Sequence, residues 1–250
     1  MNIKGTCISL TKDECGPIYV YQTKNNRILS FDGEIYQSCM KLNNVNGLNL
    51  GYTQAMMVGL LFVPHLKTAT LLGLGAGSIA KYLLSNYPIL TLHAVESRQA
   101  VADIAIKYFQ LPQTKRCILH INDAIDYVSH PQVKSDIIFS DLYSSTGMEL
   151  QQIQTTYLQD CKNALTDQGV LILNICHAQL ELQQKLNALL DTEFKHRILS
   201  FTVDGGNTIL FAFKNTIMPL TTTILNKKLQ SLPENITHTI EHYAKLLLEK

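Results

Sequence analysis

The feature that most constrains the fold is an alternation of short apolar runs with helix-length segments between residues 53 and 214. The apolar runs have the length and composition of buried strands: 69–74, 91–95, 116–121, 136–140 and 169–175. Between and after them lie helical patterns over 99–109, 151–165 and 180–190. Parallel strands need crossover connections, which are usually helices. The alternation therefore predicts an α/β fold: a doubly wound, mostly parallel sheet with helices on both faces.

The end of this region predicts an antiparallel addition to the sheet. The runs 196–203 and 208–213 flank Asp204-Gly205-Gly206-Asn207. These turn residues are typical of a β-hairpin. We therefore expect the last strand to run against its neighbours.

The two ends of the chain differ from this central part, so we expect three units. Residues 1–52 form an N-terminal β region, because 17–21 and 27–31 are strand-like runs separated by Asn25-Asn26. Residues 53–214 form a Rossmann-like domain. Residues 215–250 form a C-terminal helical extension, with an amphipathic helix expected over 236–248.

Composition excludes several classes of protein. Charged residues make up 16% of the chain and the net charge is +1, so no strong field exists to hold a nucleic acid. The low charge also suggests that a second copy covers apolar surface. The six cysteines are irregularly spaced without a C-x-x-C pair, which favours a reduced, cytoplasmic protein. Neither a signal peptide nor a run long enough to cross a membrane is found.

A glycine-rich loop, Gly73-Leu74-Gly75-Ala76-Gly77-Ser78, follows the first buried run and opens a helical segment. Glycines let the backbone approach a ligand closely, and a helix start presents free N–H groups. Glu96 ends the next strand 19 residues after Gly77, where a carboxylate can accept ribose hydroxyls. A plain turn also needs glycine, but the loop, the acid and the strand context together favour a nucleoside site. Ser78 stands where a dinucleotide loop usually has Gly or Ala.

Two further acids follow strands of the predicted sheet. Ligands of doubly wound sheets lie beyond the carboxyl ends of the strands, so Asp123 is expected near an adenine amino group. Its alternative role is a helix cap. Asp141, after the fourth strand, is the candidate for the acid that faces the reacting group. Tyr143 can place its ring against a cationic centre. A loop cap for Asp141 and simple packing for Tyr143 are the alternatives.

In order and spacing, these motifs resemble those of spermidine synthase-like proteins over about residues 27–214. The shared residues are the glycine loop, Val95-Glu96, 108–112, Asp123-Ala124, 136–141 and 165–174, preceded by 29–33, Gln37-Ser38 and Tyr52-Thr53-Gln54. The resemblance implies the S-adenosylmethionine methyltransferase fold. That fold has a seven-stranded sheet with an antiparallel last strand, here with an N-terminal β-hairpin piece. A homodimer is also implied.

The resemblance further implies roles for individual residues. Glu96 would hold the ribose, Asp123 and Ala124 the adenine, and Gln37 the thioether side of the donor. Asp141 would face the acceptor amine. The co-substrate would be S-adenosylmethionine or its decarboxylated form, and the acceptor a small molecule such as an amine. We expect no metal.

The departures from the family pattern concern charge. Aminopropyltransferases of this family usually carry Asp where this chain has Ala76, a second acid where it has Ser144, and His-Glu where it has Thr53-Gln54. Each loss removes a charge or base from a site that must hold a dication. A charged hydrogen bond is worth about 1.5–3 kcal/mol. The sequence therefore leans towards methyl transfer from S-adenosylmethionine, with Asp141 as the base. Aminopropyl transfer is the alternative, with Glu149 supplying a missing acid.

Other classes of function receive less support. A non-catalytic nucleoside-binding or dimerisation module is the second alternative, and an NAD-dependent dehydrogenase is more distant. The segment His238-Thr239-Ile240-Glu241-His242 spells an inverted zinc-protease motif. Because this segment lies close to the end of the chain, little room remains for a third ligand. We therefore expect a chance pattern on a polar helix face.

Overall fold

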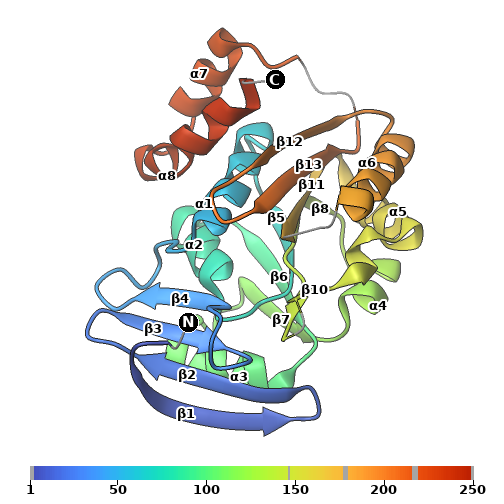
Figure 1. Cartoon of the computed structure of the whole chain (residues 1–250). Helices are drawn as coiled ribbons and strands as arrows, with labels where there is room; N and C mark the ends of the chain where they lie inside the picture. Colours follow the sequence, from blue (N-terminus) through green and yellow to red (C-terminus); the bar gives the residue numbers. More distant parts are fainter. Residues whose placement is uncertain (1–2, 146, 177–179, 216–218, 249–250) are drawn as a thin grey trace.

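The computed structural model describes residues 3–145, 147–176, 180–215 and 219–248. Within these residues the main sheet has seven strands in the order β12-β13-β11-β8-β5-β6-β7 (Figure 1). The strands are β5 (Thr68–Leu72), β6 (Thr91–Glu96), β7 (Cys117–Ile121), β8 (Ser135–Ser140), β11 (Leu165–Cys176), β12 (Ile198–Thr202) and β13 (Asn207–Phe213). β13 runs antiparallel to both of its neighbours, and the other adjacent pairs are parallel. The predicted doubly wound sheet with an antiparallel last strand is confirmed.

The central strands are apolar on both faces because helices cover both. Successive side chains of a strand point to opposite faces. In β11, Val170 and Ile172 join one apolar cluster, whereas Leu171, Leu173 and Ile175 join the other. The continuous apolar runs seen in the sequence are therefore strands buried from two sides.

The helices divide between these two faces. One face carries α1 (Gly51–Met56), the 3-10 helix η1 (Met57–Phe62), α2 (Ser78–Asn86) and α3 (Gln99–Phe109). The other carries α4 (Ala124–Ser129), α5 (Thr155–Ala164) and α6 (Leu180–Phe194). None of the helices described is both long and apolar enough to cross a membrane.

The helix expected over 151–165 is split in two. A short 3-10 helix, η2 (Leu150–Ile153), precedes α5, and Gln154 between them is extended. The side chain of Gln152 is buried and accepts a hydrogen bond from Ser140 of β8 at 2.9 Å. This contact draws the first turn towards the sheet and away from the axis of α5.

The N-terminal region is a four-stranded antiparallel sheet among the described residues, rather than the single hairpin expected. Its strands are β1 (Thr6–Asp13), β2 (Gly16–Gln22), β3 (Asn26–Ser30) and β4 (Ser38–Lys41), paired in that order. The β2–β3 hairpin is the predicted one. β1 escaped prediction because it is an exposed edge strand, and β4 because it has only four residues. The sheet packs on α3 through Ile18, Val20 and Phe109.

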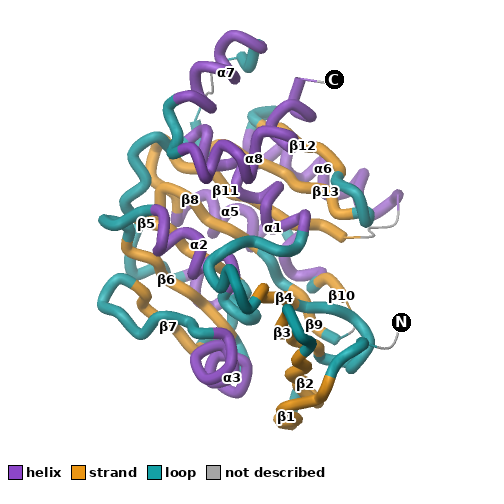
Figure 2. Tube along the Cα trace, turned by 90° about the vertical axis from the view of Figure 1, so that its left-hand side faces the viewer, coloured by secondary structure: helices purple, strands orange, loops and turns teal. Residues whose placement is uncertain are grey.

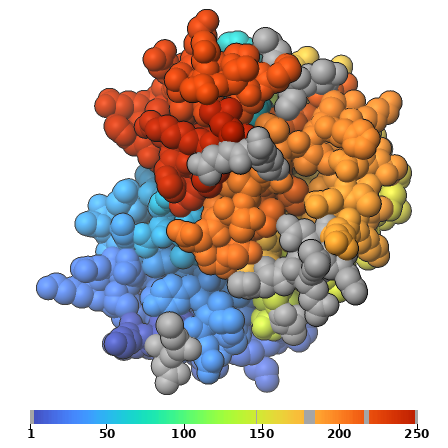
Figure 3. All heavy atoms as spheres, turned by 45° about the horizontal axis from the view of Figure 1, so that its top comes forward, coloured from blue at the N-terminus to red at the C-terminus, as the bar shows by residue number. Residues whose placement is uncertain are grey.

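The C-terminal extension is helical, as the sequence indicated. α7 (Thr222–Gln230), α8 (Glu234–Lys245) and the 3-10 helix η3 (Leu246–Leu248) bury apolar side chains in the cluster that contains α1 and η1. α8 packs directly on α1 and η1. Figure 2 shows α8 above α1 and level with β12, and in Figure 3 the red C-terminal segment lies against the orange part of the chain.

The possible zinc motif lies on α8 with both of its histidines exposed. His238 pairs with Glu234 at 3.4 Å and Glu241 with Lys245 at 2.7 Å. The part of the chain that the structure describes contains no group of three metal-ligating side chains. The motif is occupied by ordinary helix-surface pairs between residues i and i+4.

Candidate functional site

A cavity of about 680 Å³ lies where the parallel strands end. Its size is in the range of small-molecule sites. Of the residues singled out from the sequence, the cavity is lined by Gln37, Gly73, Gly75, Glu96, Asp123, Ala124, Asp141 and Tyr143. Gly77 stands apart from the cavity. It begins α2 with a φ of 73°, and a Cβ there would meet Leu111 at 2.7 Å.

Glu96 is tied to the glycine loop. Its carboxylate accepts hydrogen bonds from the backbone N–H of Gly75 at 3.3 Å and of Arg98 at 3.1 Å. Burial raises the pKa of Glu96, while the backbone hydrogen bonds act in the opposite direction. From the other side, the Ser38 hydroxyl accepts from the N–H of Ala76 at 3.2 Å. The loop is thus fixed between β6 and β4.

Gly73 brings this loop against the backbone of Asp141. It has a φ of 88°, and a Cβ at this position would stand 2.2 Å from the Asp141 carbonyl oxygen. No other residue type fits this conformation and this close approach together. The glycine loop and the segment that carries Asp141 therefore touch at Gly73.

Asp123 caps a helix and lines the cavity at the same time. It is the N-cap of α4, and its Oδ1 accepts from the N–H of Ile125 at 2.7 Å. The capping role was the alternative weighed from the sequence. Because Asp123 stands two residues after the end of β7, the cap also fixes its carboxylate at the cavity wall.

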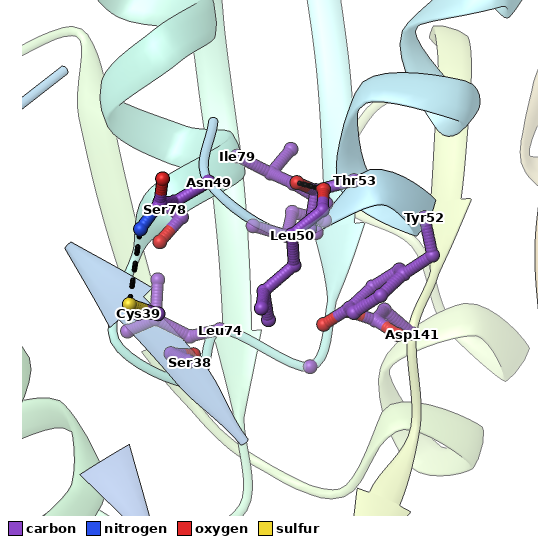
Figure 4. Close-up of a pocket in the computed structure, with 12 residues that line it drawn as sticks. Ser38, Cys39, Asn49, Leu50, Tyr52, Thr53, Leu74, Ser78, Ile79 and Asp141 are labelled. Carbon is purple, nitrogen blue, oxygen red and sulfur yellow. Dashed lines mark hydrogen bonds between the residues drawn. The ribbon is translucent and has the colours of Figure 1, made fainter. Parts of the chain in front are cut away.

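Asp141 is held by side chains from distant parts of the chain. Its carboxylate accepts from the Tyr52 hydroxyl at 3.3 Å and from the Asn174 amide at 2.8 Å. Asn174, buried at the end of β11, accepts in turn from Asn207 of β13 at 2.8 Å. Burial raises the pKa of Asp141 to about 6, although both hydrogen bonds lower it. Figure 4 shows Tyr52 and Asp141 side by side.

Tyr143 shares a partner with this network. Its hydroxyl donates to the backbone oxygen of Asn174 at 3.1 Å, and burial raises its pKa, so the phenol stays neutral. Tyr143 lies on β9 (Tyr143–Ser144), which pairs with β10 (Gly147–Met148) in a narrow hairpin. After it, the N–H of Glu149 bonds to Leu142 at 3.0 Å, and Glu149 lines the cavity.

The charged residues around the cavity are mostly acidic. The described lining residues include the acids Glu96, Asp123, Asp141 and Glu149, and one cationic residue, Arg98. Arg98 is already engaged: it pairs with Asp13 at 2.7 Å, donates to the Gly16 carbonyl and lies over the Phe31 ring at 4.8 Å. A cavity of this charge favours cationic ligands.

Three of the four positions that depart from the family pattern lie in structural surroundings, whereas the fourth, Ser144, lines the cavity. Ala76 is buried in the cluster beneath the N-terminal sheet and does not line the cavity. The Thr53 hydroxyl donates to Leu50 at 2.6 Å, and the Gln54 amide donates to Leu48 at 2.9 Å. Both satisfy the backbone just before α1.

Four residues of the site were not among the candidates taken from the sequence: Ser38, Tyr52, Asn174 and Asn207. Three of them carried a signal. Ser38 and Tyr52 stand in motifs on which the resemblance rested, and Asn174 ends an apolar run at a carboxyl strand end. Asn207 looked like a turn residue only.

The sequence is similar to proteins of known families. Residues 49–202, more than half of the chain, match the family model for the spermine/spermidine synthase domain. A polyamine aminopropyltransferase of Neisseria meningitidis is 28% identical over 195 residues, which are 77% of this chain and 74% of that protein. An eEF1A lysine and N-terminal methyltransferase of Bos taurus is 27% identical over 73% of this chain but 29% of its own length.

Solved structures show the same fold. A probable spermidine synthase from Corynebacterium glutamicum superposes with a TM-score of 0.78 at 17% identity, covering 95% of this chain and 94% of its own. Human methyltransferase-like protein 13 in complex with SAH gives a TM-score of 0.66 at 23% identity, covering 79% and 93%.

Proposed function

Because this chain belongs to the spermine/spermidine synthase domain family, we propose that it transfers the aminopropyl group of decarboxylated S-adenosylmethionine to an amine of a small cationic acceptor. The observation that carries the proposal is that the cavity around Asp141 is acidic. The cationic residue among its described lining residues, Arg98, is paired with Asp13. Relatives that match along three quarters of their length are aminopropyltransferases. That likeness outweighs the lean towards methyl transfer taken from the sequence.

In this proposal the adenosyl part of the donor lies at the ends of β5, β6 and β7. Glu96 accepts the ribose hydroxyls, and Asp123 with the backbone of Ala124 binds the adenine. Gln37, on the facing loop, lies beside the sulfonium. These residues line one continuous cavity, which is what the proposed pose requires.

The charge of the cavity favours the decarboxylated donor. A donor that kept its carboxylate would place a negative group among acids with no free cationic side chain among the described lining residues. Like charges at short range in a partly desolvated site repel strongly. Removing the carboxylate leaves a donor with only positive groups, which this cavity attracts.

The proposed chemistry is an in-line displacement. The nitrogen lone pair of the acceptor attacks the carbon next to the sulfonium, the carbon–sulfur bond breaks, and a neutral thioether leaves with the bonding electrons. An ammonium has no lone pair, so the acceptor must first lose a proton. Asp141, with a pKa of about 6, is ionised near neutral pH and takes that proton. Holding the two reactants together can supply roughly 7–11 kcal/mol of the barrier.

Methyl transfer from S-adenosylmethionine is a second candidate, supported by one specific observation. The position where aminopropyltransferases usually carry Asp is Ala76, which is buried away from the cavity. The loop therefore offers no carboxylate for the amine of a decarboxylated donor. The methyltransferase relative is compatible with this reading.

The test is to supply each donor with a panel of diamines and polyamines and to measure the nucleoside product by mass. Aminopropyl transfer releases methylthioadenosine, and methyl transfer releases S-adenosylhomocysteine. We expect the first product, and calorimetric binding of the decarboxylated donor in the micromolar range. Formation of the second product alone would refute the proposal in favour of methyl transfer. Failure of both donors to bind would leave a non-catalytic module.

A further inference from the structure

The C-terminal helix α8 lies against the element that carries Tyr52. α8 and α1 pack together, as the figures show from two sides (Figures 1 and 2). The hydroxyl of Tyr243, near the end of α8, stands 3.0 Å from where a Cβ on Gly51 would be. Gly51 is the first residue of α1 and directly precedes Tyr52. A side chain of the tail therefore abuts the backbone that orients the Tyr52 phenol.

Tyr243 also contacts the β12–β13 hairpin. Its ring is stacked with that of Phe201 on β12, with the centroids 6.5 Å apart and the planes 14° from parallel. Burial raises the pKa of Tyr243, and the nearby charge of Asp204, in the turn of the hairpin, raises it further. The same turn leads into Asn207, which donates to Asn174.

These two contacts are made with the elements that carry the two hydrogen-bond routes to Asp141, namely α1 and the β12–β13 hairpin. One route is the direct bond from Tyr52 on α1, and the other runs from Asn207 through Asn174. Tyr243 itself does not line the cavity. Any influence it has on the reaction must pass through its neighbours.

α1 depends on such packing for its orientation. It has six residues, and its N-cap Leu50 makes no side-chain capping bond. A helix this short has little stability of its own, so tertiary contacts determine how it lies. The Tyr52–Asp141 bond, at 3.3 Å, would be lost after a small displacement of α1.

We infer that Tyr243 is a positioning residue, whose side chain is wedged between α1 and the β12–β13 hairpin and keeps Tyr52 within reach of Asp141 and Asn207 within reach of Asn174. The inference rests on the proposed function, in which Asp141 accepts the proton of the acceptor amine. It gives the C-terminal extension a task in the reaction. The extension braces the acceptor side of the cavity from behind.

The test compares Tyr243→Ala with Tyr243→Phe and with Leu229→Ala. Tyr243→Ala removes the wedge, so we expect kcat to fall roughly tenfold, as for a small misplacement of catalytic groups. The acid limb of the pH profile should move to higher pH, because the Tyr52 hydroxyl no longer lowers the pKa of Asp141. Tyr243→Phe keeps the ring and its stacking on Phe201 and loses only the hydroxyl beside Gly51, so it should restore most of kcat and of the pH profile. Leu229→Ala opens a cavity in α7 within the same apolar cluster and should leave both unchanged.

A second measurement needs no turnover. The carboxyl carbon of Asp141 is titrated by NMR in the ligand-free protein, and its midpoint should rise in Tyr243→Ala only. An unchanged midpoint in Tyr243→Ala, or an equal rise in Leu229→Ala, overturns the inference. If the protein transfers neither group to any amine, the proposed function fails, while this titration still decides the role of Tyr243.

Discussion

The two ends of the cavity are built in different ways. At the donor end, Glu96 and Asp123 accept hydrogen bonds from backbone N–H groups, most of them within two residues in the sequence. At the acceptor end, Asp141 is held by side chains that lie 89 and 33 residues away in the sequence. The donor end thus follows from local motifs, whereas the acceptor end exists only once the whole sheet and the helix before it have assembled. A single substitution at the donor end should therefore change donor affinity, whereas one at the acceptor end should change the rate and its pH dependence.

The largest expected effect is the loss of turnover in Asp141→Asn. An amide cannot accept the proton, so turnover should fall by about 10²- to 10⁴-fold, the usual contribution of a general base. Donor affinity, measured by calorimetry, should stay within a few-fold of the parent. Asp126→Asn, an exposed acid on α4 outside the cavity, is the control and should keep full turnover. Loss of donor binding together with turnover would place Asp141 at the wrong end of the cavity.

Next in size is the effect of Glu96→Gln on donor affinity. The variant keeps the shape of the side chain but loses the charge that accepts the ribose hydroxyls. A hydrogen bond to a charged group is worth about 1.5–3 kcal/mol, so the donor Kd should rise roughly 10- to 100-fold. kcat at saturating donor should change little. Glu34→Gln, an exposed acid that does not line the cavity, serves as the control. An effect on kcat alone would contradict the division between the two ends.

The Asn207 link predicts a smaller change, in pH dependence. Asn207→Ala frees the Asn174 amide, which then holds Asp141 less firmly. The pKa of Asp141 should rise above about 6, and the acid limb of kcat/KM should move up by a fraction of a pH unit. Asn25→Ala, in the β2–β3 turn, is the matched control. A limb that stays in place would show that Asn174 is fixed without Asn207.

The smallest effect concerns stability, where Asp141 and a pair of histidines in the sheet should respond to pH with opposite sign. Burial raises the folded-state pKa of Asp141 above its value in the unfolded chain, so its contribution to stability is lost as pH rises from about 4 through 6. Outside the cavity lining, His93 of β6 and His120 of β7 hydrogen-bond at 3.0 Å, and burial lowers both pKa values. Their contribution is present above the unfolded pKa and is lost as pH falls.

Urea unfolding between pH 8 and pH 5 separates these terms. Asp141→Asn should be more stable than the parent at pH 8, by at most about 3 kcal/mol, with the difference shrinking as the pH falls to 5. In His120→Phe, the free energy of unfolding should decline less below pH 6.5 than it does in the parent. Parallel curves for parent and variants would show that neither group is perturbed on folding.

The sequence predicted more of the donor end than of the acceptor end for physical reasons. Gly73, Gly75, Glu96 and Asp123 stand at strand ends, and the register of a parallel sheet brings strand ends together without further information. Tyr52 reaches Asp141 only because α1 and η1 pack across β11, and Asn207 reaches Asn174 only because β13 runs antiparallel to β11. Periodicity reveals an element but not the partner across it. β1 and β4 were missed because an exposed edge and a four-residue strand carry little pattern.

The approach of Gly73 to the Asp141 carbonyl has a consequence for how this enzyme class can diversify. In the proposed pose, this contact between two stretches of main chain sets the separation of donor and acceptor, and no side chain can be exchanged to lengthen or shorten it. Altered acceptor choice would have to arise in the outer walls, such as the narrow hairpin after Asp141. Natural variants that accept other amines should accordingly differ in those walls, while the contact between Gly73 and the Asp141 carbonyl stays the same.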